Sequence, residues 1–263
     1  MRKLSTLAVA ALIAAATAVV ASVAIAGPLS PGVTLPDGNT QSMGSRIKPK
    51  KLSKTTYTPG ALEVTTKVTN STRTGGVPVP AERAVVDFDK NSKIFTKGIP
   101  TCDPAKLQNT STEVALQQCG KAKIGGGTAS ALLPVGSTIY TVNQVVTAFN
   151  GIPQGGKPVV ILHTYGTSPI QTTLVLIGPV INYSKEGYGP RIDLVIPKIA
   201  GGTGALTDFN VTISKKYKYK GKSVSFISAK CPNSKKLKSR GAFTFADGET
   251  ATPKYTQTCK QAK

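Results

Sequence analysis

The hydrophobic and polar positions of this 263-residue chain form the pattern of many short β-strands. Runs rich in β-branched and aromatic residues alternate with Gly, Pro, Asn and Asp about every ten residues, which is typical of antiparallel sandwiches and jelly rolls. Helical periodicity does not recur between these runs, so a parallel α/β sheet is not expected. The predicted strands cover residues 62–68, 84–89, 137–150, 159–165, 172–182, 191–196, 209–220, 223–230 and 242–246.

One segment, residues 103–118, has the signals of a helix. Asp103 can cap the first turn, and Pro104 suits the first helical position. Cys102 and Cys119 flank the segment, so a bond between them would hold both of its ends. We therefore predict an all-β, antiparallel β-sandwich or jelly-roll-like fold with one short helix bracketed by a disulfide.

The N-terminal residues 1–26 have the pattern of a secretory signal peptide. Arg2 and Lys3 precede an Ala-rich apolar run, and the small residues Ala24 and Ala26 occupy the −3 and −1 positions. The alternative is an uncleaved membrane anchor, because the run is nearly long enough to cross a bilayer. We expect cleavage, and hence a secreted, extracellular protein, free or associated with the cell surface, without an integral membrane segment.

Residues 27–58 have the composition of a flexible basic linker. They contain several Pro and Gly, little apolar periodicity, and the lysines Lys48, Lys50, Lys51 and Lys54. Such a segment buries too little apolar surface to fold alone. The β-sandwich domain is therefore expected to span residues 59–263.

The chain has four cysteines: Cys102, Cys119, Cys231 and Cys259. An even number in a chain with an export signal indicates two disulfides. Three pairings are possible, and the simplest joins sequence neighbours. A zinc site is disfavoured because paired C-x-x-C ligands are lacking and the only histidine lies in an apolar run. We expect neither a metal ion nor a cofactor.

Two blocks of sequence surround the cysteines. The segment GIPTCDPAKLQ…ALQQCGKAKIGGGTA contains Cys102 and Cys119, and Cys231-Pro232 is followed by AFTFADG and Cys259. Both blocks resemble segments of uncharacterised secreted two-disulfide β-rich proteins of high-GC Gram-positive bacteria. The resemblance covers most of the chain after the N-terminal segment and implies the neighbour pairing of cysteines. It implies no activity, because none is established for that group.

The chain is strongly basic, with 33 Lys and Arg against 12 Asp and Glu and a formal net charge of +21. Such an excess favours anionic partners. Outside a cell these are anionic cell-wall polymers, acidic glycans and extracellular nucleic acid. The competing explanation is that the charge only keeps the protein soluble, and net charge alone does not separate the two.

Lysines and tyrosines interleave over residues 214–222, SKKYKYKGK. Such a run can hold a polyanion by charge while its rings stack on the ligand. In a strand, however, Tyr217 and Tyr219 share one face and alternate lysines share the other, so the tyrosines are expected to pack inward. Outward lysines also protect an edge strand from aggregation. The candidate anion-binding residues are Lys216, Lys218, Lys220 and Lys222.

A second candidate binding region is the loop over residues 183–191, YSKEGYGPR. Tyr183, Tyr188 and Arg191 could form a small binding tip around Glu186. The alternative is an ordinary hairpin tip without a ligand.

Residues that could support catalysis or calcium binding are few. Asp87 and Asp89 begin like a calcium loop, but Ser92 and Gly98 replace the Gly and Glu that such a loop requires. The only histidine, His163, lies in an apolar strand, and no G-x-S-x-G elbow accompanies it. The acids are scattered, which disfavours a paired-carboxylate glycosidase. No catalytic residue is predicted.

We therefore favour a secreted, non-catalytic protein that binds anionic extracellular or cell-envelope polymers through a basic surface. One alternative is a secreted glycan or ester hydrolase, which requires two acids, or His163 with a serine and an acid, in one cleft. A second alternative is an extracellular scaffold or carrier of a small apolar ligand, which requires a cavity between the sheets. The oligomeric state is not predicted.

Overall fold

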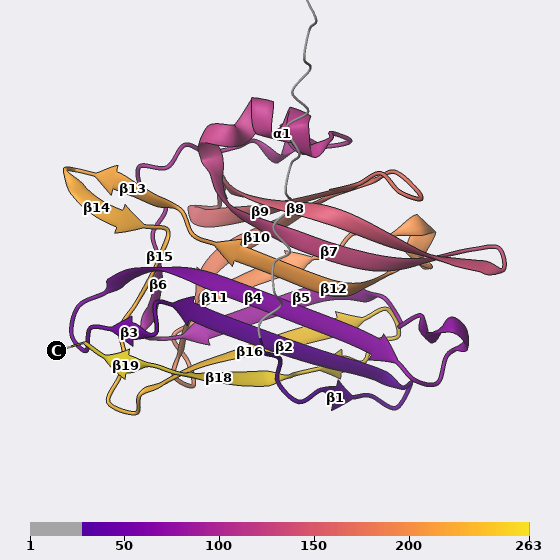
Figure 1. Cartoon of the computed structure of the whole chain (residues 1–263), viewed down its shortest axis with the longest axis horizontal. Helices are drawn as coiled ribbons and strands as arrows, with labels where there is room; N and C mark the ends of the chain where they lie inside the picture. The colour runs from indigo at the N-terminus through magenta and orange to yellow at the C-terminus, as the bar shows by residue number, and fades with distance from the viewer. Residues whose placement is uncertain (1–27, 263) are drawn as a thin grey trace, which may run out of the picture.

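A computed structural model describes residues 28–262, and one curled antiparallel sheet dominates it (Figure 1). The strands of this sheet are connected in the order β1-β2-β4-β12-β7-β8-β9-β10-β11-β5-β16-β17, with β6, β15 and β18 attached at its sides. The strands are β1 Val33–Thr34, β2 Asn39–Lys48, β3 Lys51–Leu52, β4 Thr58–Asn70, β5 Ala81–Asp89, β6 Ser92–Ile94, β7 Lys123–Val135, β8 Thr138–Gln154, β9 Lys157–Gly166, β10 Thr172–Asn182, β11 Tyr188–Val195, β12 Ala205–Ile213, β13 Lys216–Tyr219, β14 Lys222–Ser225, β15 Ile227–Ala229, β16 Lys236–Phe245, β17 Thr250–Ala251, β18 Lys254–Thr258 and β19 Lys260–Gln261.

The predicted all-β, antiparallel fold with one short helix is confirmed. The two layers of the expected sandwich are the two halves of one nearly closed, barrel-like sheet. Its interior is filled by apolar side chains from both halves, among them the fully buried Met43, Phe226 and Phe245. The predicted signal peptide over residues 1–26 lies outside the described residues.

The predicted linker over residues 27–58 is wrong for the part that the structure describes. Most of β2 is buried, and the strand pairs with β4 along its whole length. Its inward positions include the polar residues Asn39, Gln41 and Ser45, so the strand lacks the apolar alternation on which the prediction depends. Asn39 Nδ2 donates to the Val79 carbonyl at 3.2 Å, which satisfies that buried amide. The folded unit therefore begins well before residue 59.

β7 also lacks a strand signal in the sequence, because three glycines lie near its start. A Cβ atom at Gly127 would lie 1.9 Å from the Asn210 carbonyl oxygen, and one at Gly125 would lie 2.1 Å from the Thr212 carbonyl oxygen. Only glycine permits this close approach between β7 and β12. The glycines that remove the strand signal from the sequence are thus the residues that allow β7 to pair with β12.

The helical segment between the first two cysteines is divided in two. Asp103 caps a short 3-10 helix, η2 (Pro104–Leu107), where its Oδ1 accepts from the Ala105 N–H at 2.9 Å. The α-helix itself, α1 (Thr112–Cys119), begins later and is capped by Ser111. Both lie over the half of the sheet that contains β8 and β9 (Figure 1).

Both disulfides join sequence neighbours. Cys102 is bonded to Cys119 with a Cα–Cα distance of 5.4 Å, and Cys231 is bonded to Cys259 with a Cα–Cα distance of 5.9 Å. All four cysteines of the chain are therefore paired. The first bond holds the ends of the helical segment, and the second joins the approach to β16 to the end of β18.

The curled sheet closes where β18 lies beside β2. Among residues 28–262 no backbone ladder joins these two strands, and the side chain of Gln257 bridges them instead. Its Oε1 accepts from the Ile47 N–H at 2.6 Å, and its Nε2 donates to the Ile47 carbonyl at 2.7 Å. Gln257 is buried, so one carboxamide replaces a backbone partner at this closure.

Candidate anion-binding site

The predicted strand over residues 209–220 is two strands in different sheets. β12 ends at Ile213, and β13 forms a separate hairpin with β14. Between them, the N–H groups of Ser214 and Lys215 both donate to the Ile124 carbonyl, at 3.0 and 3.1 Å. These bonds turn the chain away from the curled sheet, a tertiary effect that strand alternation does not encode.

The tyrosines of this hairpin pack inward, as strand geometry predicts. The Tyr217 hydroxyl donates to the carbonyls of Phe95 and Lys97, at 3.1 and 3.0 Å. The rings of Tyr217 and Tyr219 lie against Phe95, with centroid distances of 6.4 and 5.4 Å. Burial raises the pKa of the Tyr217 hydroxyl, and the neighbouring Tyr219 adds to this. These contacts anchor the hairpin and leave both rings half-buried.

The four predicted anion-binding lysines come together on the outer side of the hairpin and at its tip. Lys216, Lys218, Lys220 and Lys222 are all exposed. Lys220 and Gly221 have φ values of 48° and 75°, the left-handed pair that a two-residue hairpin turn requires. The hairpin therefore presents its lysines to solvent on a base held by the buried tyrosines.

Other lysine-bearing segments are hydrogen-bonded around the base of the hairpin. The Lys260 N–H donates to the Lys50 carbonyl, and the Lys230 N–H donates to the Asn91 carbonyl. Figure 1 shows β3, β6, β15 and β19 gathered at the same end of the molecule as the hairpin. We call the segments 50–57, 90–98, 214–236 and 259–262 the basic end. Its exposed lysines are Lys50, Lys51, Lys54, Lys90, Lys93, Lys97, Lys216, Lys218, Lys220, Lys222, Lys235, Lys236 and Lys260.

The basic end has no carboxylate of its own. None of its four segments contains Asp or Glu. Within residues 28–262, the ion pairs involve Arg46, Lys48, Arg83, Arg191 and Arg240, all of which lie outside these segments. Among residues 28–262, no ion pair therefore neutralises the positive charge of the basic end.

Two features show how the lysines of the basic end are placed. Lys51 and Lys260 are direct partners in the parallel pairing of β3 with β19, which sets two like charges on neighbouring strands. The ammonium groups of Lys230 and Lys93 lie 4.8 and 5.7 Å from the ring centroid of Tyr57. These two lysines make favourable cation–π contacts with the same ring.

The second predicted binding region forms a closed network. Asp87 is buried and accepts from Arg191 Nε at 2.6 Å and from Arg240 Nε at 2.8 Å. Arg240 also donates to Glu186 and to the Tyr183 hydroxyl. Burial works against the positive charge of Arg240, but these hydrogen bonds outweigh it and raise its pKa.

The tyrosines of that region cover the two arginines. The Arg191 guanidinium lies 3.6 Å from the ring centroid of Tyr183, and the Arg240 guanidinium lies 4.6 Å from that of Tyr188. Burial raises the pKa of Tyr188. The structure thus brings Tyr183, Tyr188 and Arg191 together, but their contacts are with one another and with Asp87 and Arg240. The sequence suggests Arg240 only as an extension of the basic run over residues 214–222, whereas the structure places it in this network, on a strand distant from the loop.

The remaining candidates for chemistry are separated or enclosed. His163 is fully buried, and its Nε2 lies 3.0 Å from the Thr110 carbonyl, to which it donates. Burial lowers the pKa of His163, which keeps the ring neutral. Asp89 accepts from Asn91 and from the Lys238 N–H. None of the five main clefts of the described residues is lined by two acids.

Comparison with known proteins does not identify the chain. No protein-family model, curated protein or solved structure matches it. Within residues 28–262, none of the helices has the length and apolar character needed to cross a membrane. The formed disulfides fit an oxidising compartment.

Proposed function

We propose that this protein is secreted and holds anionic extracellular or cell-envelope polymers on its basic end, without catalysing a reaction on them. The observation that carries this proposal is the uncompensated charge of the basic end, which four separate segments supply. The signal-like N-terminus and the two disulfides support export.

The arrangement of the lysines supports a binding role over solubility alone. Scattered lysines would keep the protein soluble and would repel one another less. Here Lys51 faces Lys260 across a strand pair, and Lys93 and Lys230 share one tyrosine ring. A polymer with closely spaced negative charges relieves this repulsion and releases its own counterions on binding.

The same geometry indicates what the protein recognises in the polymer. Because Tyr217 and Tyr219 are packed against Phe95, their rings do not form a platform for nucleic-acid bases. Lysine ammonium groups act as point charges with little directional preference. We therefore expect recognition of phosphate or carboxylate charge along a polymer backbone, with little discrimination of sequence or sugar identity.

The test is a salt titration of binding to isolated cell wall, heparin and duplex DNA, with neutral dextran as the blank. For DNA, the logarithm of the affinity should fall linearly with the logarithm of salt concentration, with a slope of about −0.9 for each phosphate contacted. The triple variant Lys216→Gln, Lys218→Gln, Lys222→Gln should make that slope shallower by up to about 3, one unit for each lost contact. Lys220 is left unchanged because its backbone has a positive φ.

The matched control removes three exposed charges away from the basic end, with Lys67→Gln, Arg73→Gln and Lys198→Gln. β4 starts at the basic end, where it pairs with β15, and Lys67 lies in its distant half. This control should leave the slope for DNA within about half a unit of that of the original protein. Equal weakening by the two triple variants would show that net charge, and not the basic end, governs binding. Retention on all three polymers that is as strong at high salt as at low salt would overturn the proposal.

A further inference from the structure

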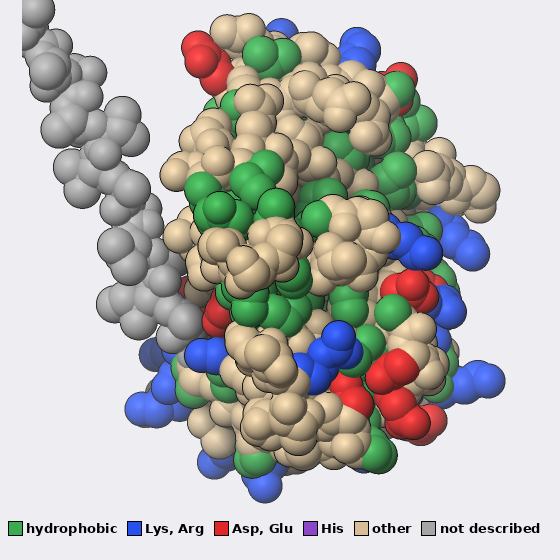
Figure 2. Space-filling view, turned by 90° about the vertical axis from the view of Figure 1, so that its right-hand side faces the viewer, with side chains coloured by type: hydrophobic (Ala, Val, Ile, Leu, Met, Phe, Trp, Pro, Cys, Tyr) green, Lys and Arg blue, Asp and Glu red, His purple; other side chains and the backbone are tan. Residues whose placement is uncertain are grey.

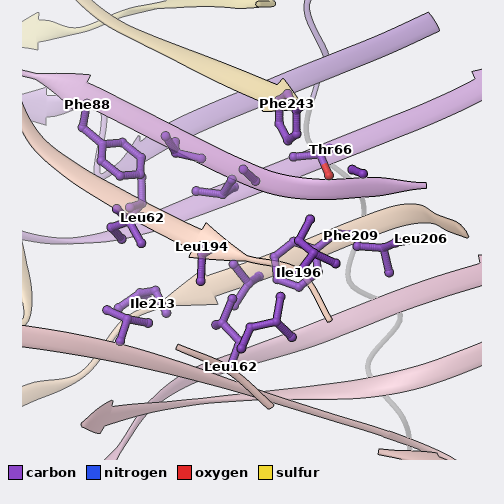
Figure 3. A pocket seen from close by; sticks show the side chains of 18 of the residues that line it. Leu62, Thr66, Phe88, Leu162, Leu194, Ile196, Leu206, Phe209, Ile213 and Phe243 are labelled. Atoms are coloured by element: carbon purple, nitrogen blue, oxygen red, sulfur yellow. The ribbon is translucent and has the colours of Figure 1, made fainter. Parts of the chain in front are cut away.

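The interior of the curled sheet contains an apolar cavity of about 100 Å³. Figure 3 shows side chains from strands on both sides of this space pointing toward one another, with Leu62 and Leu162 among them. Gln41 and Thr66 are the polar members of the lining, and none of the lining residues is charged. A cavity with so few polar partners does not hold ordered water and accepts apolar guests.

This cavity adjoins a pocket at the surface. It shares Ala81, Ile196 and Leu206 with a second pocket of about 240 Å³. These three residues are only half-buried, and we call them the apolar mouth. In Figure 3, Ile196 and Leu206 lie with Phe209 toward one side of the cavity. These three side chains therefore separate the cavity from the surface pocket, and a change in their conformation would join the two.

The apolar mouth faces away from the basic end. Asp208, two residues after Leu206, pairs with Lys67 in the far half of β4. Figure 2 views the molecule from this side and shows hydrophobic side chains in a band across its middle. Side chains of Lys or Arg lie on both sides of the band. The apolar mouth and the exposed lysines of the basic end therefore lie apart, although Ile94, Phe226 and Ile227 of the basic end also line the cavity.

We infer that this cavity binds a small uncharged apolar molecule, which enters through the apolar mouth. The absence of charged lining residues excludes an ion from the buried part of the site, because an unpaired buried charge is strongly disfavoured. An apolar cavity of about 150 Å³ in another protein holds benzene. This cavity has about two-thirds of that volume, so the buried part of the ligand is no larger than one ring or a chain of a few carbons, whose end reaches toward the mouth. This inference does not depend on polymer binding at the basic end.

Benzene and xenon are suitable probes for the full chain. Benzene should raise the midpoint of thermal unfolding in a saturable manner, by about 3–6 °C at tenfold excess over its Kd. Xenon should give a shifted resonance that benzene displaces. If the original protein shows neither a saturable rise nor a displaced xenon signal, the inference is wrong.

Three variants locate the bound probe. Ala84→Leu fills the cavity from β5 and should abolish both responses. Because Ala84 is buried and its replacement could prevent folding, Ala81→Phe at the half-buried mouth provides a second blocking variant with the same expected loss. Ala105→Phe, on the exposed surface of η2, is the matched control and should keep the original response. The inference would be overturned if Ala81→Phe kept the benzene response, and Ala84→Leu kept it too where that variant folds. Benzene would then bind elsewhere on the protein.

Discussion

Replacement of Gln257 by methionine should open the closure between β18 and β2. Methionine keeps the length of the side chain but can neither accept from the Ile47 N–H nor donate to the Ile47 carbonyl. Both Gln257 and Ile47 are buried, so water cannot take over these two bonds without local opening. Each buried polar group that loses its partner costs about 1–3 kcal/mol.

The two orphaned groups together should lower the free energy of unfolding by about 2–6 kcal/mol. For a chain of this length, that corresponds to a fall in Tm of about 4–24 °C. Urea unfolding measures the loss directly, provided that the m-value is unchanged. Hydrogen exchange at the Ile47 amide should accelerate with it, because that N–H loses its acceptor.

The Gln257→Glu variant separates hydrogen bonding from packing. At neutral pH its carboxylate accepts from the Ile47 N–H but cannot donate to the carbonyl, whereas the protonated acid does both. Burial raises the pKa of the introduced carboxyl group in the folded state above its ordinary value of about 4.3. Stability relative to the original protein is therefore recovered below that value and lost as the pH rises through the folded-state pKa.

Two outcomes would refute this account of the closure. One is a Gln257→Met protein that unfolds at the original urea midpoint. The other is a Gln257→Glu protein whose deficit is the same at acidic and neutral pH, which would mean that the shape of the side chain matters and its hydrogen bonds do not.

Two further predictions concern the region beneath α1 and the disulfides. Because burial lowers the pKa of His163, the unfolded chain binds a proton first as the pH falls below about 6.5. The urea concentration at the midpoint of unfolding should thus decrease as the pH is lowered from about 6.5 to about 5. The decrease should be smaller in His163→Gln, whose amide can still donate to the Thr110 carbonyl. An equal decrease in the two proteins would contradict the prediction. Removing the Cys102–Cys119 bond, which spans 17 residues, should cost about 3 kcal/mol, and removing the Cys231–Cys259 bond, which spans 28 residues, should cost about 3.5 kcal/mol. Hydrogen exchange should show faster opening of α1 only in the variant that lacks the Cys102–Cys119 bond. Faster exchange throughout the structure in both disulfide variants would show that neither bond acts locally.

The sequence predicts the strands whose cores are built from β-branched residues, such as β9 and β10. It does not predict β2, because that strand buries amides and small residues that are hydrogen-bonded to other segments. It does not predict β7 either, since glycine gives no strand signal while making the contact with β12 possible. In both cases the deciding interaction is with a partner that is distant in the sequence, which local alternation does not encode.

The candidate site shows the same division. The lysines of the hairpin are recognisable from their spacing, and so is the inward packing of Tyr217 and Tyr219. Other lysines of the basic end, Lys51, Lys93 and Lys260, lie near the hairpin only because segments that are far apart in the sequence are hydrogen-bonded to one another, as β3 is to β19. The apolar cavity exists because side chains from several strands do not completely fill the space between them. This packing depends on the tertiary structure and cannot be predicted from the pattern of hydrophobic residues along the sequence.

The bridge from Gln257 to Ile47 also bears on how the protein is made. The two residues are 210 positions apart, and β3 likewise pairs with β19 near the other end of the chain. During synthesis, the early strands emerge long before the partners that complete them, and contacts of such long range form slowly. A newly made chain therefore remains an open sheet until β18 and β19 have been made. In this respect the C-terminal segment sets the time at which folding can finish, and the edge of β2 needs protection until then.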